Sequence, residues 1–330
     1  MPTIVRFHSL GGPEVLKFED EPTRQPGPGE VRLKIKAVGL NRAESMYFHG
    51  HYLERAELPS RLGYEAAGVV EAVGPGVDSG LVGKTIATVP GFSQNKYGLL
   101  GEEAIVPASV LAEYPANLSV VEGAAIWMQY LTAWGALVHF GKIAKGDFAV
   151  ITAASSSVGL AAIQIVKDAG ATAIAVTRTS AKRDELLALK ADHVVVTGEE
   201  NFVARVNQIT AGQGARLSFD PVGGPFIENL AAAAAHQGII FQYGRLAPEP
   251  TPFPLGAALR KGLTVRGYTL HEITGDAEAY AAAKKYIYDR LADGHFKVKI
   301  AKTFPFAQTV EAYNYLESNA QIGKVVITVP

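Results

Sequence analysis

The stretch FAVITAASSSVGLAAIQIVKDAG, residues 148–170, decides the fold of this chain. An apolar β-branched run, Val150 to Thr152, is followed by a turn of alanines and serines and then by apolar residues at helical spacing. This order suits pyrophosphate binding, because small side chains let the backbone approach phosphates and a helix N-terminus points amide groups at them. Alanine and serine replace the first two glycines of the usual G-x-G-x-x-G pattern. An ordinary strand–helix connection therefore stays the alternative reading of the turn.

The next predicted strand, residues 171–177, favours a particular nucleotide at this turn. An NAD site places Asp or Glu at the end of this strand, whereas here Arg178, Thr179 and Lys182 follow it. A carboxylate would repel a 2′-phosphate, while a guanidinium, an ammonium and hydroxyls can bind it. The sequence therefore predicts NADPH as the cofactor, with Ser155, Ser156, Ser157 and Val158 as the pyrophosphate cradle. The alternative is that Lys182 and Arg183 are solvated residues of the following helix.

Composition restricts the class of protein. The chain has 330 residues, 48% hydrophobic residues and a formal net charge of −1, which indicates a globular α/β protein large enough for two cores. No polybasic run suggests a nucleic-acid partner, and no segment is apolar enough to predict a membrane span. The start, MPTIVRFHSL, lacks the apolar core of a signal peptide, so a cytoplasmic location is expected. The chain contains no cysteine, which excludes disulfides, thiol nucleophiles and cysteine-ligated zinc.

The distribution of patterns predicts two domains, one of them discontinuous. Residues 3–115 contain short strand patterns separated by turn signals, as expected of a β-rich domain. Residues 119–265 alternate strand and helix patterns, which predicts a parallel sheet with right-handed crossovers. After residue 267 we expect one helix (277–294) and one final strand (324–330), which return to the first domain. The run AAAAAH, residues 231–236, is interpreted as helix.

Several motifs in a fixed order resemble one family. These are GGPEVLKFED (11–20), VGLNRAE (38–44), LGYEAAGVVEAVGPGV (62–77), MQYLTAWGAL (128–137), the serine-rich turn, FDPVGG (219–224) and ESNAQIGKVVITVP (317–330). Together they resemble the zinc-independent quinone oxidoreductases of the medium-chain dehydrogenase/reductase superfamily, nearly from end to end. The resemblance implies a Rossmann doubly wound parallel sheet domain at 122–267. It also implies a GroES-like β-rich catalytic domain at 1–121 and 268–330, with the cofactor in the cleft between the two.

The resemblance also explains the missing metal ligands. Zinc-dependent relatives place Cys and His where this chain has Asn41 and Tyr64. Lewis-acid activation of an alcohol is then not expected. The remaining reaction is hydride transfer to an acceptor that is already electrophilic. Such a transfer requires that the nicotinamide be positioned and the acceptor oxygen be hydrogen-bonded, and it can proceed without a metal.

Asn41, Tyr47, Tyr52 and Tyr64 are predicted to line the substrate side. The family has Asn and Tyr at the positions of Asn41 and Tyr52, and such groups can donate hydrogen bonds to a carbonyl oxygen. In many relatives the tyrosine that corresponds to Tyr47 lies one residue earlier, at the position where this chain has Met46. The alternative for each tyrosine is a half-buried aromatic with its hydroxyl at the surface.

Other positions are predicted to border the cofactor because the resemblance places them there: Asn41, Met128, Thr132, Thr197, Val222, Tyr243, Gly244, Arg245 and Lys324. A helix threonine bonded to its own backbone is the alternative for Thr132, and a solvated side chain is the alternative for Lys324.

Two further pairs of residues are interpreted as ordinary structure. Arg42 and Glu44, which lie just after Asn41, are expected to form a surface pair. His49 and His51 are not expected to hold a metal, because no third ligand of the right kind recurs nearby.

The predicted function is an NADPH-dependent, zinc-free oxidoreductase that transfers hydride to a quinone or a related electrophilic carbonyl. An enone, alkenal or enoyl-thioester reductase stays open, as does an NADPH-binding protein with little turnover, because fold does not fix function. The resemblance implies a homodimer in which LTVRGYTL, residues 263–270, provides the edge strand that pairs across the interface.

Overall fold

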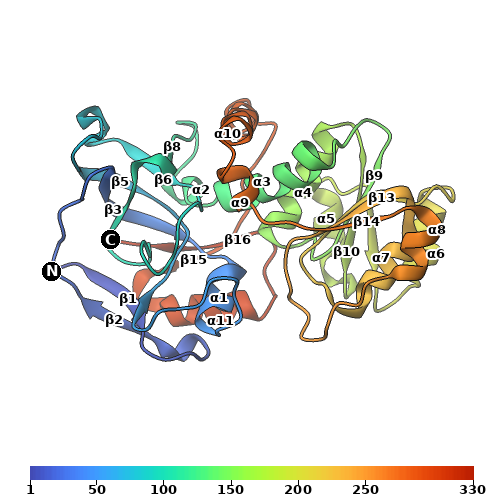
Figure 1. The fold of residues 1–330 in the computed structure, drawn as a ribbon, viewed down its shortest axis with the longest axis horizontal. Helices are drawn as coiled ribbons and strands as arrows, with labels where there is room; N and C mark the ends of the chain where they lie inside the picture. Colours follow the sequence, from blue (N-terminus) through green and yellow to red (C-terminus); the bar gives the residue numbers. More distant parts are fainter. The chain divides into compact units, whose positions relative to one another are not determined.

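The computed structural model describes residues 1–330, which form two compact units. The first, here called the split unit, combines Met1–Met128 with Lys284–Pro330; the second, the continuous unit, is Gln129–Ala283. In Figure 1 the split unit therefore has the blue and red ends of the colour scale, and the continuous unit has green to orange. The domain limits at residues 121 and 267 stay a prediction.

The continuous unit contains a six-stranded sheet in the order β11-β10-β9-β12-β13-β14, with every neighbouring pair parallel. Its strands are β9 (Phe148–Ile151), β10 (Thr172–Thr177), β11 (His193–Val196), β12 (Ala215–Asp220), β13 (Ala234–Gln242) and β14 (Thr264–Gly267). The chain runs outward from β9 to β11 and then returns to the other side of β9 with β12. This is the Rossmann strand order, and it confirms the predicted fold class.

Helices connect these parallel strands: α4 (Ser157–Asp168), α5 (Arg183–Ala188), α6 (Phe202–Ile209), α7 (Ile227–Ala233) and α8 (Leu255–Lys261). The two halves of the sheet are built in opposite directions from the centre, so right-handed crossovers place their helices on opposite faces. Strand order reverses beside β9, and in such sheets ligands bind at the carboxyl ends of the strands at this switch point.

Apolar β-branched residues explain why these short strands lie inside the unit. Val150, Ile174 and Val195 are fully buried on adjacent strands, and they pack in one cluster with Phe202 and Val206 of α6. A parallel sheet covered on both faces requires such continuous apolar runs.

The split unit is built mainly from antiparallel strands, as expected of a GroES-like domain. One sheet has the order β15-β16-β3-β5-β6-β8 with β7 paired to β3, and a second has the order β2-β1-β4. The bounds are β1 (Thr3–Phe7), β2 (Leu16–Asp20), β3 (Glu30–Gly39), β4 (Ser60–Arg61), β5 (Glu65–Val73), β6 (Thr85–Thr88), β7 (Glu103–Pro107), β8 (Leu111–Ala112), β15 (Ile300–Pro305) and β16 (Lys324–Thr328).

The pairing of β16 with β3 brings the two ends of the sequence together. Val326 pairs with Gly39 in antiparallel register, so Lys324 lies opposite the residues that follow β3. This register places the C-terminal lysine beside Asn41.

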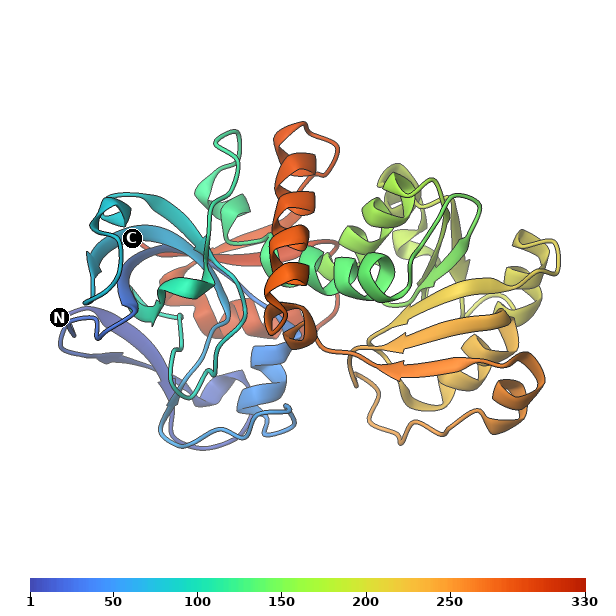
Figure 2. The same cartoon turned by 45° about the horizontal axis from the view of Figure 1, so that its top comes forward.

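The remaining helices are α1 (Arg42–Phe48), α2 (Val120–Gly123), α3 (Trp127–Trp134), α9 (His271–Thr274), α10 (Ala277–Ala292) and α11 (Thr309–Glu317). The longest, α10, carries the chain from the continuous unit back into the split unit (Figure 1 and Figure 2). No helix combines the length and the apolar character that crossing a membrane requires.

Two expectations about secondary structure were wrong. The C-terminal part holds β15 and α11 in addition to the expected helix and strand. The alanine run is helical only to Ala233, and Ala234–His236 begin β13 instead. Ala234 pairs with Ala215, so strand pairing overrides the helix propensity of alanine at this point.

Candidate active site

The turn after β9 is held by the serine that replaces a glycine of the nucleotide pattern. Ser156 is the N-cap of α4, and its Oγ accepts a hydrogen bond from the amide of Gly159 at 3.0 Å. An N-cap serine satisfies one of the amides that a helix start leaves unpaired. Ala153, in the same turn, has a positive φ of 46°, a conformation that glycine usually supplies. The turn therefore keeps the glycine-type backbone at Ala153 and gains a cap at Ser156.

The last glycine of the pattern is kept for a steric reason. A Cβ on Gly159 would lie 2.6 Å from the carbonyl oxygen of Ala154, closer than such contacts allow. Helix α4 can therefore approach the turn only because residue 159 has no side chain. This close approach of helix and turn is the function of the third glycine in dinucleotide sites.

The motif FDPVGG forms a second loop at the same switch point. Asp220, at the end of β12, is fully buried and accepts hydrogen bonds from the amides of Val222 at 3.1 Å and Gly223 at 2.9 Å. The hydroxyl of Thr152 donates to the same carboxylate. Gly223 has a φ of 69°, which a side chain would strain. The loops after β9 and β12 are thus fastened together at the carboxyl edge of the sheet.

The cationic residues after β10 differ in what they contact. Lys182 Nζ donates to Ser155 Oγ at 3.1 Å, so this lysine reaches the serine turn. Burial and the nearby Arg178 guanidinium lower the pKa of Lys182. Arg183 instead lies 3.5 Å from a carboxylate oxygen of Glu200. Lys182 therefore contacts the predicted cradle, whereas Arg183 belongs to a surface ion pair.

Arg178 and its neighbours lie at the same edge. Arg178 is exposed, its side chain makes no hydrogen bond or ion pair, and Thr179 beside it is exposed too. Thr197, after β11, donates its amide to the carbonyl of Thr177 at 2.9 Å. Arg178 and Thr179, predicted for the 2′-phosphate, and Thr197, predicted to border the cofactor, thus follow the ends of neighbouring strands.

Tyr243, Gly244 and Arg245 follow β13. The ring of Tyr243 stacks on Phe219 with 4.0 Å between centroids, and its buried hydroxyl has no hydrogen-bond partner. Gly244 is required sterically, because a Cβ there would lie 2.8 Å from the carbonyl of Pro221. Arg245 is exposed, and Thr132 on α3 is 6% exposed. Their roles beside a cofactor stay predictions.

The serine turn and its cations fit a phosphorylated dinucleotide. The turn leaves no side chain between α4 and the backbone, and Lys182 and Arg178 provide positive charge beside it. A doubly charged phosphate would stabilise two cations that otherwise repel each other.

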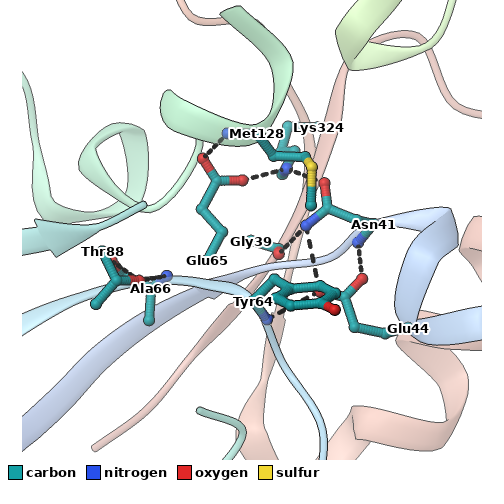
Figure 3. Close-up of polar contacts among 9 residues, drawn as sticks. All are labelled: Gly39, Asn41, Glu44, Tyr64, Glu65, Ala66, Thr88, Met128 and Lys324. Atoms are coloured by element: carbon teal, nitrogen blue, oxygen red, sulfur yellow. Dashed lines mark hydrogen bonds and ion pairs between the residues drawn. The ribbon is translucent and has the colours of Figure 1, made fainter. Parts of the chain in front are cut away.

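In the split unit, Asn41 begins α1 through a reciprocal cap. Its amide donates to Glu44 Oε2 at 2.7 Å, the capping-box contact between the N-cap and the third helical residue (Figure 3). Glu44 Oε1 also accepts from the amide of Tyr64 at 3.1 Å. One carboxylate therefore fixes the backbone of two predicted site residues.

The Asn41 side chain has a fixed orientation. Its Oδ1 accepts from Lys324 Nζ at 2.6 Å, while its Nδ2 donates to the carbonyl of Gly39 at 3.1 Å and to Glu44 Oε1 at 3.2 Å (Figure 3). Both amide hydrogens are used inside the protein. The Asn41 amide therefore has no hydrogen left for a further partner.

Lys324 and Glu65 form a buried ion pair. Nζ lies 2.5 Å from Glu65 Oε2, and both side chains are 0% exposed (Figure 3). The other carboxylate oxygen accepts from the amide of Met128 at 3.0 Å, at the start of α3. Lys324 is thus an internal partner of Asn41 and Glu65, in contrast to the solvated side chain considered as the alternative.

The expected surface pair of Arg42 and Glu44 is wrong. Glu44 is fully buried, and it bonds to Asn41 and Tyr64. Burial raises the pKa of Glu44 to about 7, against the opposing effect of the Lys324 charge. The sequence missed this because the N-cap and the third helical residue form a capping box that turns the carboxylate inward.

The three predicted tyrosines form a row of ring contacts. Tyr47 lies 6.5 Å from Tyr52, and Tyr52 lies 6.1 Å from Tyr64, measured between centroids. The Tyr47 ring is fully buried, and its hydroxyl bonds to Ser60 at 2.7 Å and to Asn95 at 2.5 Å. Tyr52 is the partly exposed member of the row. It is therefore the tyrosine of the row that solvent reaches.

The histidines have ordinary partners. His49 Nε2 lies 3.1 Å from Glu317 Oε1, and its ring is stacked 6.4 Å from that of His51. No group of three or more His, Asp or Glu side chains is placed to hold a metal ion.

Sequence reasoning did not single out Glu65, Asp220 or Glu54. Glu65 and Asp220 lie within quoted motifs, next to Tyr64 and before Val222, so their motif position was the available signal. Glu54 carries no signal in the sequence.

Comparison with known proteins gives a consistent result. Residues 27–116 match the family described as alcohol dehydrogenase GroES-like domain, and residues 157–285 match zinc-binding dehydrogenase. Quinone oxidoreductase 1 of Escherichia coli (strain K12) is 30% identical over 330 residues, 99% of each chain.

Solved structures agree over the whole length. The crystal structure of Escherichia coli quinone oxidoreductase complexed with NADPH has a TM-score of 0.90 at 29% identity, covering 99% of each chain. A structure described as an NAD-dependent alcohol dehydrogenase has a TM-score of 0.91 at 31% identity, covering 100% of each. The chain belongs to the quinone oxidoreductase-like family of the medium-chain dehydrogenase/reductase superfamily.

Proposed function

We propose that this protein is an NADPH-dependent oxidoreductase that transfers hydride to a quinone or an enone. The proposal rests mainly on the turn after β9. Ser156 caps α4 in this turn, and Lys182 contacts the neighbouring Ser155 at the switch point of the Rossmann sheet. The relative crystallised with NADPH supports the same cofactor. NADPH supplies the hydride, and the residues of this chain bind and orient the two reactants.

On the cofactor side, Ser155 to Val158 would surround the pyrophosphate, while Arg178, Thr179 and Lys182 would bind the 2′-phosphate. Thr132, Thr197, Val222, Tyr243, Gly244 and Arg245 would border the rest of the dinucleotide. The unpaired hydroxyl of Tyr243 is a polar group that a bound ligand could satisfy.

On the acceptor side, Asn41 takes a role different from the predicted donor. With both amide hydrogens already bonded inside the protein, the Asn41 side chain cannot donate a hydrogen bond to a carbonyl. Tyr52 is then the side chain that donates to the acceptor oxygen, with Tyr64 packed behind it. Tyr47 supports the row through Ser60 and Asn95.

The chemistry proceeds without zinc in this proposal. Asn41 and Tyr64 stand where zinc-dependent relatives have Cys and His, and the Lys324 ammonium lies 2.6 Å from Asn41 Oδ1. A dication at this place would be repelled by the ammonium. The acceptor must then be electrophilic by itself, as quinones and enones are.

We further propose that the protein is a cytoplasmic homodimer. Strand β14 is an edge of the six-stranded sheet, which leaves one side of its backbone open for pairing with a second copy. Sedimentation of the purified protein measures the oligomeric state directly.

The function is tested by initial rates of NADPH oxidation with quinones, enones and enoyl thioesters. Saturable oxidation with quinones or enones is expected. A preference for enoyl thioesters would support the alternative reductase. Tight NADPH binding without oxidation across the panel would favour a cofactor-binding protein and contradict the enzymatic proposal.

A further inference from the structure

Glu54 contacts Tyr64, one of the tyrosines at which we place the acceptor. Its carboxylate accepts a long hydrogen bond from the Tyr64 hydroxyl at 3.5 Å. It also accepts from the amide of Gln94 at 3.1 Å, from Asn95 Nδ2 at 3.1 Å and from the hydroxyl of Ser93. The segment that follows Tyr52 is thereby fastened to residues 93–95 through one acidic side chain.

None of the hydrogen-bond partners of Glu54 carries a charge. Four neutral donors surround the carboxylate, and no Lys, Arg or His forms an ion pair with it. Neutral hydrogen-bond donors of the protein therefore solvate the Glu54 carboxylate, and no cation is paired with it.

The other charges near the tyrosines do not cancel it. Burial is the main cause of the raised pKa values of Tyr47, Tyr52 and Tyr64, and the charged side chains that add to the effect are Glu44, Glu54 and Glu57. Lys324 is occupied by Glu65 at 2.5 Å.

The cationic side chains closest to Glu54 in the sequence and on α1 interact with other groups or with solvent. Arg55 is exposed to solvent, and Lys96 Nζ lies 4.9 Å from the centroid of Tyr97. Arg42 of α1 interacts electrostatically with Glu317 of α11. None of these cations therefore pairs with Glu54.

We propose that Glu54 makes the acceptor site selective against anionic acceptors, so that the substrate class is uncharged quinones and enones. Like charges a few ångströms apart repel, and because Tyr52 and Glu54 are only partly exposed the repulsion is stronger than in bulk water. An acceptor with a carboxylate or sulfonate beside its reacting carbonyl, such as an acrylate, then binds poorly. This inference rests on the proposed function and specifies its substrate class.

The test compares kcat/KM for naphthoquinone, its sulfonate and its trimethylammonium derivative, with NADPH saturating. Glu54→Gln should raise the sulfonate-to-neutral ratio about tenfold over wild type and lower the trimethylammonium-to-neutral ratio. Dividing by the wild-type ratios removes differences in intrinsic reactivity. Glu113→Gln is the matched control, because it removes one exposed carboxylate of the same unit and should leave both ratios within about twofold.

A purely structural role for Glu54 would slow all three acceptors alike, and unchanged ratios in Glu54→Gln would overturn the proposal. If that variant does not fold, wild-type protein gives the answer, because salt should raise the sulfonate-to-neutral ratio about threefold. A ratio independent of salt would overturn it too. If wild type oxidises NADPH with none of the three acceptors, the proposed function itself fails and the inference fails with it.

Discussion

The Lys324 ammonium lies 2.5 Å from the Glu65 carboxylate, and solvent reaches neither side chain. The same ammonium donates to Asn41 Oδ1 at 2.6 Å, and the same carboxylate accepts from Met128 at the start of α3. This pair therefore joins the last strand of the split unit to the segment after β3 and to a helix start. Because Lys324 also fixes the orientation of the Asn41 amide, the ion pair that stabilises the split unit also orders a predicted site residue.

The buried pair predicts a defined pattern of stability losses. Lys324→Met should lower the free energy of unfolding by about 3–5 kcal/mol, because it leaves the Glu65 carboxylate buried without its partner. Glu65→Gln combined with Lys324→Met should recover most of that loss. Denaturant unfolding measures both. Lys167→Met is the control, since its pair with Asp192 is partly exposed and is expected to contribute about 1 kcal/mol or less. A double variant as unstable as the single one would contradict this account.

Selectivity for the cofactor phosphate depends on Arg178 and Lys182. Replacing both with neutral residues should weaken NADPH binding at least about thirtyfold and change NADH binding little, because charge-assisted hydrogen bonds contribute about 1.5–3 kcal/mol each. Fluorescence titration of the two nucleotides gives the dissociation constants. Arg183→Gln is the control, since that residue pairs with Glu200. Equal losses for NADPH and NADH would refute the 2′-phosphate site.

The side chain of Ser156 should stabilise α4 in a way that the glycine of the usual pattern cannot, because its Oγ caps the helix. Ser156→Ala should lower the free energy of unfolding by about 1 kcal/mol, and Ser156→Gly by only a few tenths, because glycine is tolerated at an N-cap. Thermal and denaturant unfolding measure the difference. Ser157→Ala, one residue into the helix, should cost less than Ser156→Ala. The reverse order would show that the cap does not stabilise α4.

The raised pKa of Glu44 predicts a pH dependence of stability. Its pKa changes from 4.5 to about 7 on folding because burial disfavours the charged form. The folded protein therefore holds a proton that the unfolded chain releases, and the contribution of Glu44 to stability falls as pH rises from 4.5 to 7.

Glu44→Gln should remove this dependence. The difference in unfolding free energy between wild type and the variant should change by about 3 kcal/mol across that range, as determined by denaturant unfolding at several pH values. A difference that does not vary with pH would mean that Glu44 is ionised throughout.

The fold and the position of the serine turn between β9 and α4 could be predicted from the sequence because both depend on local patterns. Alternating strands and helices predicted the parallel sheet, and the serine turn predicted the residues at its carboxyl edge. What it missed depends on contacts across the chain. Lys324 meets Asn41 only through the pairing of β16 with β3, and Glu54 meets Tyr64 only because of how its segment folds back.

The most direct test of the central claim measures acceptor-dependent NADPH oxidation and zinc content in the same protein sample. We expect saturable oxidation with naphthoquinone by protein that contains no stoichiometric zinc. No oxidation above the rate without protein, or activity that rises and falls with one bound zinc per chain, would contradict it.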